Sequence, residues 1–242
     1  MRLMTAPGVD FEGDALLRFN IAFDRRRQVG EQVYEALKRA IVSLQLPPGT
    51  AISENRICRQ VGVSRTHVRS AIIRLVEDGL IEVFPQKGSF VAPIKLSAVR
   101  DNHFIRKALE LAVLERAAQG WTRESSAGAR QILASHAAAL KIGDIEAVYT
   151  LDEDFHRFFC SAARLDGVWA MIEIAKARVD RVHRLAAVHG RLPKVIVEHR
   201  AILDALDEGD AERAKACLDF HLERAPAIVE ALIEKHERYF VD

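Results

Sequence analysis

Along most of this 242-residue chain, apolar residues recur every three or four positions, and isolated glycines interrupt the pattern. In an α-helix this spacing places the apolar side chains in one stripe that a core can bury. In residues 98–242, here called the rear of the chain, the pattern between these breaks predicts helices over 98–119, 124–142, 144–162, 166–189, 193–208 and 210–238. We expect Pro226 to kink or split the last helix. The rear of the chain is therefore predicted to form an all-α helical bundle.

The composition favours a folded and mainly α protein. Apolar residues make up 49% of the chain, enough to fill cores, and the 13 glycines and 7 prolines are few for a β-sandwich. No apolar run approaches the roughly 18 residues that cross a bilayer. The three cysteines are odd in number and lie far apart, which is typical of reduced thiols. We therefore expect a cytoplasmic protein with no membrane partner.

Residues 28–93 differ from the rear of the chain because turn and strand signals follow their helical segments. The pattern predicts a helix from Val29, a second helix between Ser53 and Gly62, and a third over 65–78. Two β-prone segments, 80–84 and 89–92, then flank a turn. This order is that of a winged helix-turn-helix, which places its third helix in the major groove of DNA.

Charge is distributed unevenly between these two parts. Residues 24–93 contain 11 Lys and Arg against 7 Asp and Glu, a net charge of +4, whereas residues 98–242 contain 21 against 24, a net charge of −3. The contrast indicates two domains with different partners. We expect an N-terminal tail, a DNA-binding domain, a linker and a helical effector domain, over residues 1–27, 28–93, 94–97 and 98–242.

The predicted third helix of the front domain carries most of the candidate DNA contacts. Arg65 and Arg69 lie four residues apart, on the face opposite the apolar stripe. A guanidinium can bind guanine through two hydrogen bonds or clamp a phosphate. The candidate DNA-binding residues are Ser64, Arg65, Thr66, His67, Arg69, Arg56, Lys87 and Gly88. The alternative is a small helical bundle whose arginines are only solvated.

Four polar residues of the rear domain could converge on a metal ion. Asp152 and His156 lie one helical turn apart beside the apolar Phe155, so they are expected to face the interior. His199 and His221 lie on the apolar sides of two later helices. Three imidazoles and a carboxylate suit a divalent ion. We expect zinc in the isolated protein, with nickel, manganese or iron as alternatives. The four groups could instead form hydrogen bonds around water.

Several short motifs of the front domain closely resemble the DNA-binding domain of the GntR family of bacterial transcription regulators. The matching segments are Leu46-Pro47-Pro48-Gly49-Thr50, Ile52-Ser53-Glu54, Gly62-Val63-Ser64-Arg65-Thr66, Val68-Arg69, Arg74-Leu75, Gly79-Leu80-Ile81 and Gly88-Ser89-Phe90-Val91. The resemblance implies a dimer on a short palindromic operator, base contacts by Arg65 and Arg69, and a minor-groove approach by Gly88. Departures from the usual pattern at Asn55, His67 and Ser70, with Arg56 displaced by one position, imply an unusual operator preference.

Residues 98–238 resemble the FCD effector domain of the FadR-like branch of that family. The matching segments are Arg106-Lys107-Ala108-Leu109-Glu110, Asp152-Glu153-Asp154-Phe155-His156, Glu198-His199-Arg200-Ala201-Ile202, Gly209-Asp210 and His221. The resemblance implies that Asp152, His156, His199 and His221 bind a divalent metal ion. It also implies that Arg106 lies near the ligand pocket, although a salt bridge to Glu110 one turn away is an alternative.

We therefore expect a ligand-responsive transcriptional repressor that senses a small carboxylate at its metal ion. Arg106, Arg178 and Arg181 are the candidate effector-binding residues, since a guanidinium can hold a second carboxylate. Arg178 and Arg181 could instead be charges on a dimer surface. The functional alternatives are a metal-dependent hydrolytic or lyase-type enzyme, a bundle in which the metal only holds helices together, and a DNA-binding protein that senses nothing. No His-Glu-x-x-His motif supports the enzyme.

Overall fold

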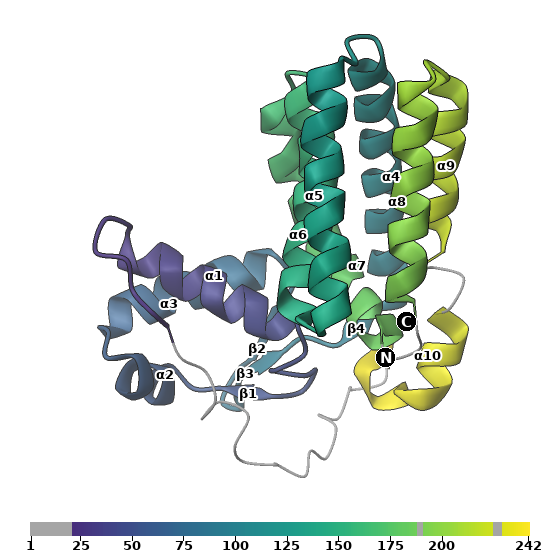
Figure 1. Cartoon of the computed structure of the whole chain (residues 1–242). Helices are drawn as coiled ribbons and strands as arrows, with labels where there is room; N and C mark the ends of the chain where they lie inside the picture. The colour runs from purple at the N-terminus through teal and green to yellow at the C-terminus, as the bar shows by residue number, and fades with distance from the viewer. Residues whose placement is uncertain (1–20, 188–190, 225–228) are drawn as a thin grey trace. The chain divides into compact units, whose positions relative to one another are not determined.

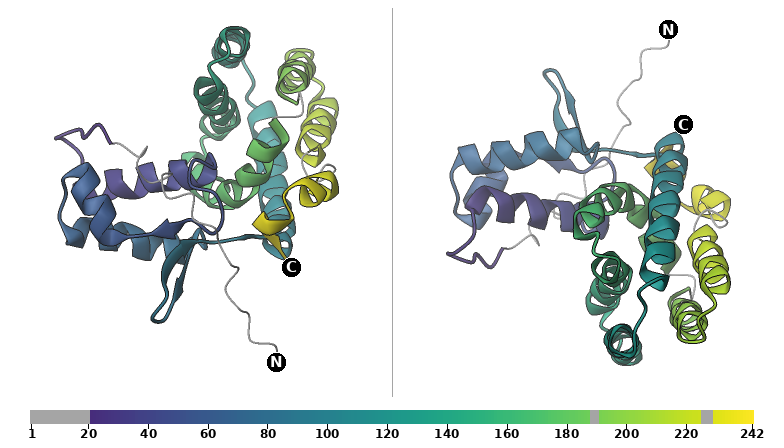
Figure 2. Two further views of the ribbon diagram at one scale, coloured as in Figure 1. Left: turned by 90° about the horizontal axis from the view of Figure 1, so that it is seen from below. Right: turned by 90° about the horizontal axis from the view of Figure 1, so that it is seen from above.

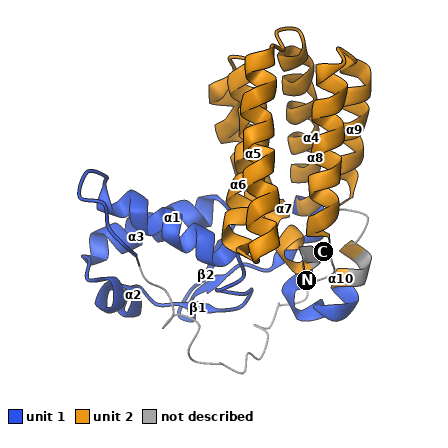
Figure 3. Ribbon diagram, viewed as in Figure 1, with its two compact units in different colours: residues 1–98, 233–242 blue, residues 99–232 orange. Residues whose placement is uncertain are grey.

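The computed structural model describes residues 21–187, 191–224 and 229–242. The chain divides into two compact units, which Figure 3 shows in separate colours. One unit comprises the chain up to Ala98 together with Ile233–Asp242, and the other comprises Val99–Leu232. Each unit is described by itself below. No described helix is long and apolar enough to cross a membrane.

The described part of the first unit before Ile94 consists of three helices and a small antiparallel sheet (Figure 1). Its helices are α1 (Val29–Val42), α2 (Glu54–Val61) and α3 (Arg65–Glu77). The sheet has the order β1-β3-β2, built from Ala51–Ile52, Gly88–Val91 and Ile81–Phe84. Strands β2 and β3 form the predicted hairpin, with Ile81 opposite Val91 and Phe84 opposite Gly88. In the two views of Figure 2 this hairpin projects beyond the three helices as a wing.

Local sequence explains why α2 and α3 form a tight pair. The side chain of Ser53 accepts a hydrogen bond from the backbone N–H of Arg56 and so caps α2. Gly62 ends α2 with a φ of +70°, a conformation that costs glycine little, and this lets the chain turn directly into α3. The core beneath joins Leu37 of α1 to Val68 and Leu75 of α3, all fully buried. The winged helix-turn-helix predicted from the sequence is therefore present.

The second unit is the predicted helical bundle. Its helices are α4 (Leu96–Ala118), α5 (Arg123–Ile142), α6 (Ile145–Ala162), α7 (Asp166–Ala187), α8 (Leu192–Asp207) and α9 (Ala211–Glu223). Helix α5 packs against both α6 and α8, α8 packs against α9, and α6 packs against α7. Aspartates cap two of the helices, because Asp144 and Asp210 each accept a backbone N–H three residues ahead. Phe155, Ile202 and Leu218 lie in the shared core.

The end of the chain differs from the sequence prediction. The helix predicted over 210–238 is instead α9, the short helix α10 (Val229–Lys235), a 3₁₀ turn over Glu237–Tyr239 and strand β5 (Phe240–Val241). Strand β5 pairs in parallel with β4 (Ile94–Lys95), which lies in the predicted linker. This pairing places residues 233–242 in the first unit, although the sequence assigned them to the effector domain. Pro226, the predicted kink, lies outside the described residues.

Removing buried volume from α3 tests the core of the first unit. Leu75 is fully buried, whereas Ile73 on the same helix is 52% exposed. We expect Leu75→Ala to lower the free energy of unfolding of this unit by about 2–5 kcal/mol, because it leaves a cavity. The matched control Ile73→Ala is expected to change it by no more than about 0.5 kcal/mol. Hydrogen exchange of the α1 and α3 amides measures this unit separately from the bundle, and equal effects of the two substitutions would contradict the packing described.

Candidate metal centre and nucleic-acid interface

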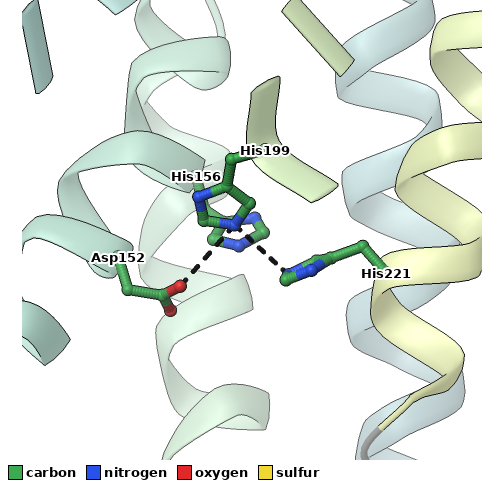
Figure 4. Close-up of side chains that lie close together, drawn as sticks. All are labelled: Asp152, His156, His199 and His221. Carbon is green, nitrogen blue, oxygen red and sulfur yellow. Dashed lines mark hydrogen bonds and ion pairs between the residues drawn. The ribbon is translucent and has the colours of Figure 1, made fainter. Parts of the chain in front are cut away.

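Four side chains from three helices converge inside the bundle. Asp152 and His156 come from α6, His199 from α8 and His221 from α9, and one ligand atom of each lies within 4.8 Å of the others. His199 Nε2 is 3.4 Å from His221 Nε2 and 3.6 Å from Asp152 Oδ1. Figure 4 shows the carboxylate and the imidazoles directed toward a common point. Since metal–ligand bonds to these atoms are about 2.0–2.2 Å long, donors this close together can share one ion.

A carboxylate outside the cluster holds the outer nitrogen of two of these histidines. His156 Nδ1 lies 2.5 Å from Glu110 Oε2, and His221 Nδ1 lies 2.8 Å from Glu198 Oε2. An ionised carboxylate can only accept hydrogen bonds, so each Nδ1 carries a proton, and in the neutral imidazole Nε2 then keeps its lone pair. The carboxylate therefore fixes the tautomer that a metal ligand requires.

Each outer carboxylate is in turn held by an arginine. Arg106 Nε donates to Glu110 over 2.5 Å within α4, and the two terminal nitrogens of Arg191 donate to Glu198 over 2.6 Å each. Arg106 and Glu110 are both buried. These pairs give two chains of contacts that run from an arginine through a glutamate to an imidazole.

The electrostatics of the centre favour ionised carboxylates at Glu110 and Asp152 and neutral imidazoles at His199 and His221. Burial alone would raise the pKa of Glu110, but Arg106 and His156 hold it well below its usual value. Burial would likewise raise the pKa of Asp152, which His156 and Lys176 keep low. Burial lowers the pKa of His221 to about 4, despite the opposing hydrogen bond to Glu198, and lowers the pKa of His199 well below its usual value. Metal ligands need these charge states.

The donor set fits a divalent ion. His156 Nε2 is buried and has no hydrogen-bond partner among the described residues. A buried polar atom without a partner is costly, and a bound ion would supply one. One carboxylate and three imidazoles are ligands that zinc, nickel, manganese and iron accept.

The structure places the three candidate effector arginines differently. Arg106 is buried in its salt bridge with Glu110, which was the alternative considered from the sequence. Arg181 is buried on α7, and burial lowers its pKa to about 10. Arg178 is half-buried on the same helix. On the same helix α7, Nζ of the buried Lys176 lies 2.6 Å from Asp180 Oδ2.

Sequence reasoning missed the roles of Glu110 and Glu198. It treated Glu110 only as a partner for Arg106, whereas the structure shows that Glu110 also binds the outer nitrogen of His156. Glu198 precedes His199 in the sequence but binds His221 of the next helix. The available signals were the position of Glu198 next to the predicted ligand His199 and that of Glu110 one turn from Arg106. Neither shows which histidine is bound, because spacing along one helix does not show contacts between helices.

The candidate DNA-binding residues lie on the surface of the first unit. Ser64, Arg65, Thr66, His67 and Arg69 are all exposed at the start of α3. Ser64 occupies the N-cap position, but its side chain accepts no capping hydrogen bond. Arg69 Nε lies 4.0 Å from the carboxylate of Glu54. The first turn of α3 therefore presents donors outward, as major-groove contact requires.

The other candidates lie on the wing and on α2. Lys87 and Gly88 are exposed in the hairpin, and Gly88 has a φ of +109° that favours glycine. A Cβ atom at Gly88 would meet nothing within 4 Å, so the backbone conformation rather than crowding within the chain calls for glycine. Arg56 is half-buried on α2. His67 of α3 also lines a groove of about 530 Å³ with Gly30 and Glu31 of α1.

Both parts of the chain match known protein families. Residues 29–91 match the family described as bacterial regulatory proteins, gntR family, and residues 102–224 match the FCD domain. A similar chain is the HTH-type transcriptional repressor RspR of Escherichia coli K12, which is 33% identical over 213 residues, covering 88% of this chain and 93% of RspR. An uncharacterized HTH-type transcriptional regulator of Streptomyces ambofaciens is 36% identical over 198 residues, covering 78% of this chain and 80% of the relative.

Among solved structures, E. coli McbR/YncC shares the fold. The TM-score is 0.74 at 23% identity, over 87% of this chain and 99% of McbR. The relatives are transcriptional regulators and not enzymes, so the enzyme alternative is set aside. The resemblance drawn from the sequence motifs is confirmed: this chain belongs to the GntR family of bacterial transcription regulators and carries an FCD domain.

Proposed function

We propose that the protein is a repressor that binds a palindromic operator as a homodimer and releases it when a small carboxylate binds a metal ion in the FCD domain. Asp152, His156, His199 and His221 hold the ion in this proposal. The observation that supports it most directly is the buried His156 Nε2, which has no partner among the described side chains and belongs to a cluster with suitable ligand atoms.

Charge balance around the ion favours an anionic guest. Arg106 and Arg191 neutralise the outer carboxylates of Glu110 and Glu198, and Lys176 pairs with Asp180 and with the half-exposed Glu153. Asp152 is then the one anionic ligand, so a divalent ion with three neutral imidazoles keeps a net charge of +1. A buried net charge is costly unless it is compensated. A carboxylate in an open coordination position supplies both a ligand oxygen and the missing negative charge. Arg178 and Arg181 are the candidates for a second carboxylate group of the guest.

Operator recognition is assigned to α3 and the wing. Arg65 and Arg69 read base edges, Ser64, Thr66 and His67 contact the backbone or bases beside them, and Gly88 lets the wing approach the minor groove next to Lys87. Arg56 of α2 is a further contact to DNA. Two copies related by a two-fold axis would place two α3 helices on the two halves of a palindrome.

Guest binding must be coupled to the DNA-binding unit for the protein to respond. A carboxylate can shift the dimer away from its operator-binding state only if it binds the two states with different affinity. The ion and its guest contact α6, α8 and α9, so the two states would differ in the arrangement of these helices.

Removal of a direct ligand tests the metal centre. Loss of a residue that only hydrogen-bonds to a metal ligand lowers metal affinity about 10- to 100-fold. Asp152 is proposed as a direct ligand, so we expect Asp152→Asn to weaken Zn²⁺ binding at least about 100-fold. The matched control is Asp154→Asn, on the same helix but paired with Arg157. Competition titration of chelated, reloaded protein measures both, with one ion per chain expected for the unaltered protein and the control. Equal affinity of all three proteins would exclude Asp152 as a ligand.

Substitution of Arg65 and of Arg69 by alanine tests whether these α3 residues recognise the DNA sequence. The probe is a duplex selected from a random pool by the unaltered protein. We expect Arg65→Ala and Arg69→Ala each to cost about 1–3 kcal/mol of binding free energy on this duplex. We also expect each variant to prefer the selected duplex over a scrambled duplex less strongly than the unaltered protein does. Arg123→Ala, an exposed arginine of the bundle, serves as a charge-matched control. Loss of affinity that is equal for the selected and scrambled duplexes would assign these arginines to phosphate contacts only.

Operator affinity with and without carboxylates tests the switch. A panel of mono-, di- and tricarboxylates is first screened by calorimetry against the Zn²⁺-loaded protein. An acid that binds is expected to weaken operator affinity by about 5- to 150-fold, the usual range of allosteric coupling. The metal-free protein is expected to show no such response. Acids that bind at the metal but leave operator affinity unchanged would reduce the metal to a structural role.

A further inference from the structure

His136 of α5 is a buried histidine that the proposed function does not use. It is 1% exposed, and its Nδ1 has no hydrogen-bond partner among the described residues. Its ring lies 5.7 Å from the ring of His199, measured between centroids.

His199 is the exception among the three clustered histidines. Glu110 and Glu198 hold the outer nitrogens of His156 and His221, but no described group bonds to His199 Nδ1, which is also buried. An ion bound at Nε2 forces the proton of a neutral imidazole onto Nδ1. That N–H group would then be buried without an acceptor, an arrangement that folded proteins rarely leave uncompensated.

The surroundings of His199 limit which group can serve as that acceptor. Phe155 stacks on its ring with the two centroids 3.9 Å apart, and His156 and His221 make T-shaped contacts with it. Phe155 has no polar atom, and the inner nitrogens of the two histidines belong to the proposed ligand set. Of the aromatic rings in contact with His199, His136 therefore offers an unpartnered nitrogen outside the ligand set.

We infer that His136 is a positioning residue for the metal centre, which holds the Nδ1–H of His199 through one buried water molecule. The two nitrogens make no direct hydrogen bond in the structure, and a buried water needs at least two polar partners, which they provide. The imidazole of His136 thus takes the place that a carboxylate takes at the other two histidines. This inference rests on the proposed metal centre.

Three substitutions at His136 separate hydrogen bonding from packing. Phe keeps a ring of similar size without a polar atom, Asn places its amide where Nδ1 lies, and Gln places it nearer Nε2. We expect His136→Phe to weaken Zn²⁺ binding about 10- to 100-fold, as loss of an outer-shell partner does. His136→Asn is expected to retain affinity within about threefold, and His136→Gln to fall between them. Thermal unfolding of the metal-free proteins checks that each variant folds.

Direct detection of the proton on His199 complements the affinity measurements. With ¹⁵N-labelled histidine, the Zn²⁺-loaded protein is expected to show a slowly exchanging proton on His199 Nδ1, and His136→Phe is expected to lose it. Unchanged Zn²⁺ affinity of His136→Phe, or equal weakening by all three substitutions, would overturn the role of His136. Failure of the unaltered protein to bind Zn²⁺ would instead overturn the metal centre itself.

Discussion

The proposed sensor depends on the hydrogen bonds from His156 and His221 to the carboxylates of Glu110 and Glu198. Without them, each imidazole could carry its proton on the inner nitrogen, and an ion would bind more weakly because it would first have to shift that proton. The arginines behind the carboxylates keep them ionised in a buried site, where a lone carboxylate would take up a proton. Three helices in addition to α6 thus contribute to the centre: α4 through Glu110, α8 through Glu198 and His199, and α9 through His221.

The chain passes between its two units twice. The boundaries fall after Ala98, within α4, and after Leu232, within α10. Helix α4 also carries Arg106 and Glu110, so the contacts that fix His156 lie on the helix that leads out of the DNA-binding unit. The last residues return to that unit, where Phe240 pairs with Ile94 of β4. Both connections are routes by which a shift among α4, α6, α8 and α9 could reach the wing and α3.

Much of the architecture follows from local sequence. The helical period, Ser53 as a cap, Gly62 as a turn and the hairpin signals define the first unit. The boundaries of α4 to α8 and the start of α9 fall within two residues of the predicted ones, whereas α9 ends well before the predicted end of the last helix. The two-residue strands β1, β4 and β5 were not predicted, because segments this short carry no alternating pattern and their partners are distant in sequence.

The four residues of the candidate cluster were also predicted from the sequence, whereas the carboxylates that hold them were not. Asp152 and His156 share a helix, so their spacing reports a common face. Pairing of Glu110 with His156 and of Glu198 with His221 depends on how separate helices pack, which spacing along one helix does not encode. The same limit applies to His136, whose proximity to His199 arises from the packing of α5 against α8.

The central claim is that the buried side-chain cluster holds one divalent ion that a carboxylate completes. Anomalous diffraction from metal-loaded crystals, recorded on both sides of the absorption edge of the ion, tests it most directly. The account predicts one peak per chain, about 2.0–2.2 Å from Asp152 and from the Nε2 atoms of His156, His199 and His221, with oxygen density of a soaked carboxylate beside it. No peak at this position, or an ion held elsewhere while these nitrogens remain without a ligand, would contradict the account.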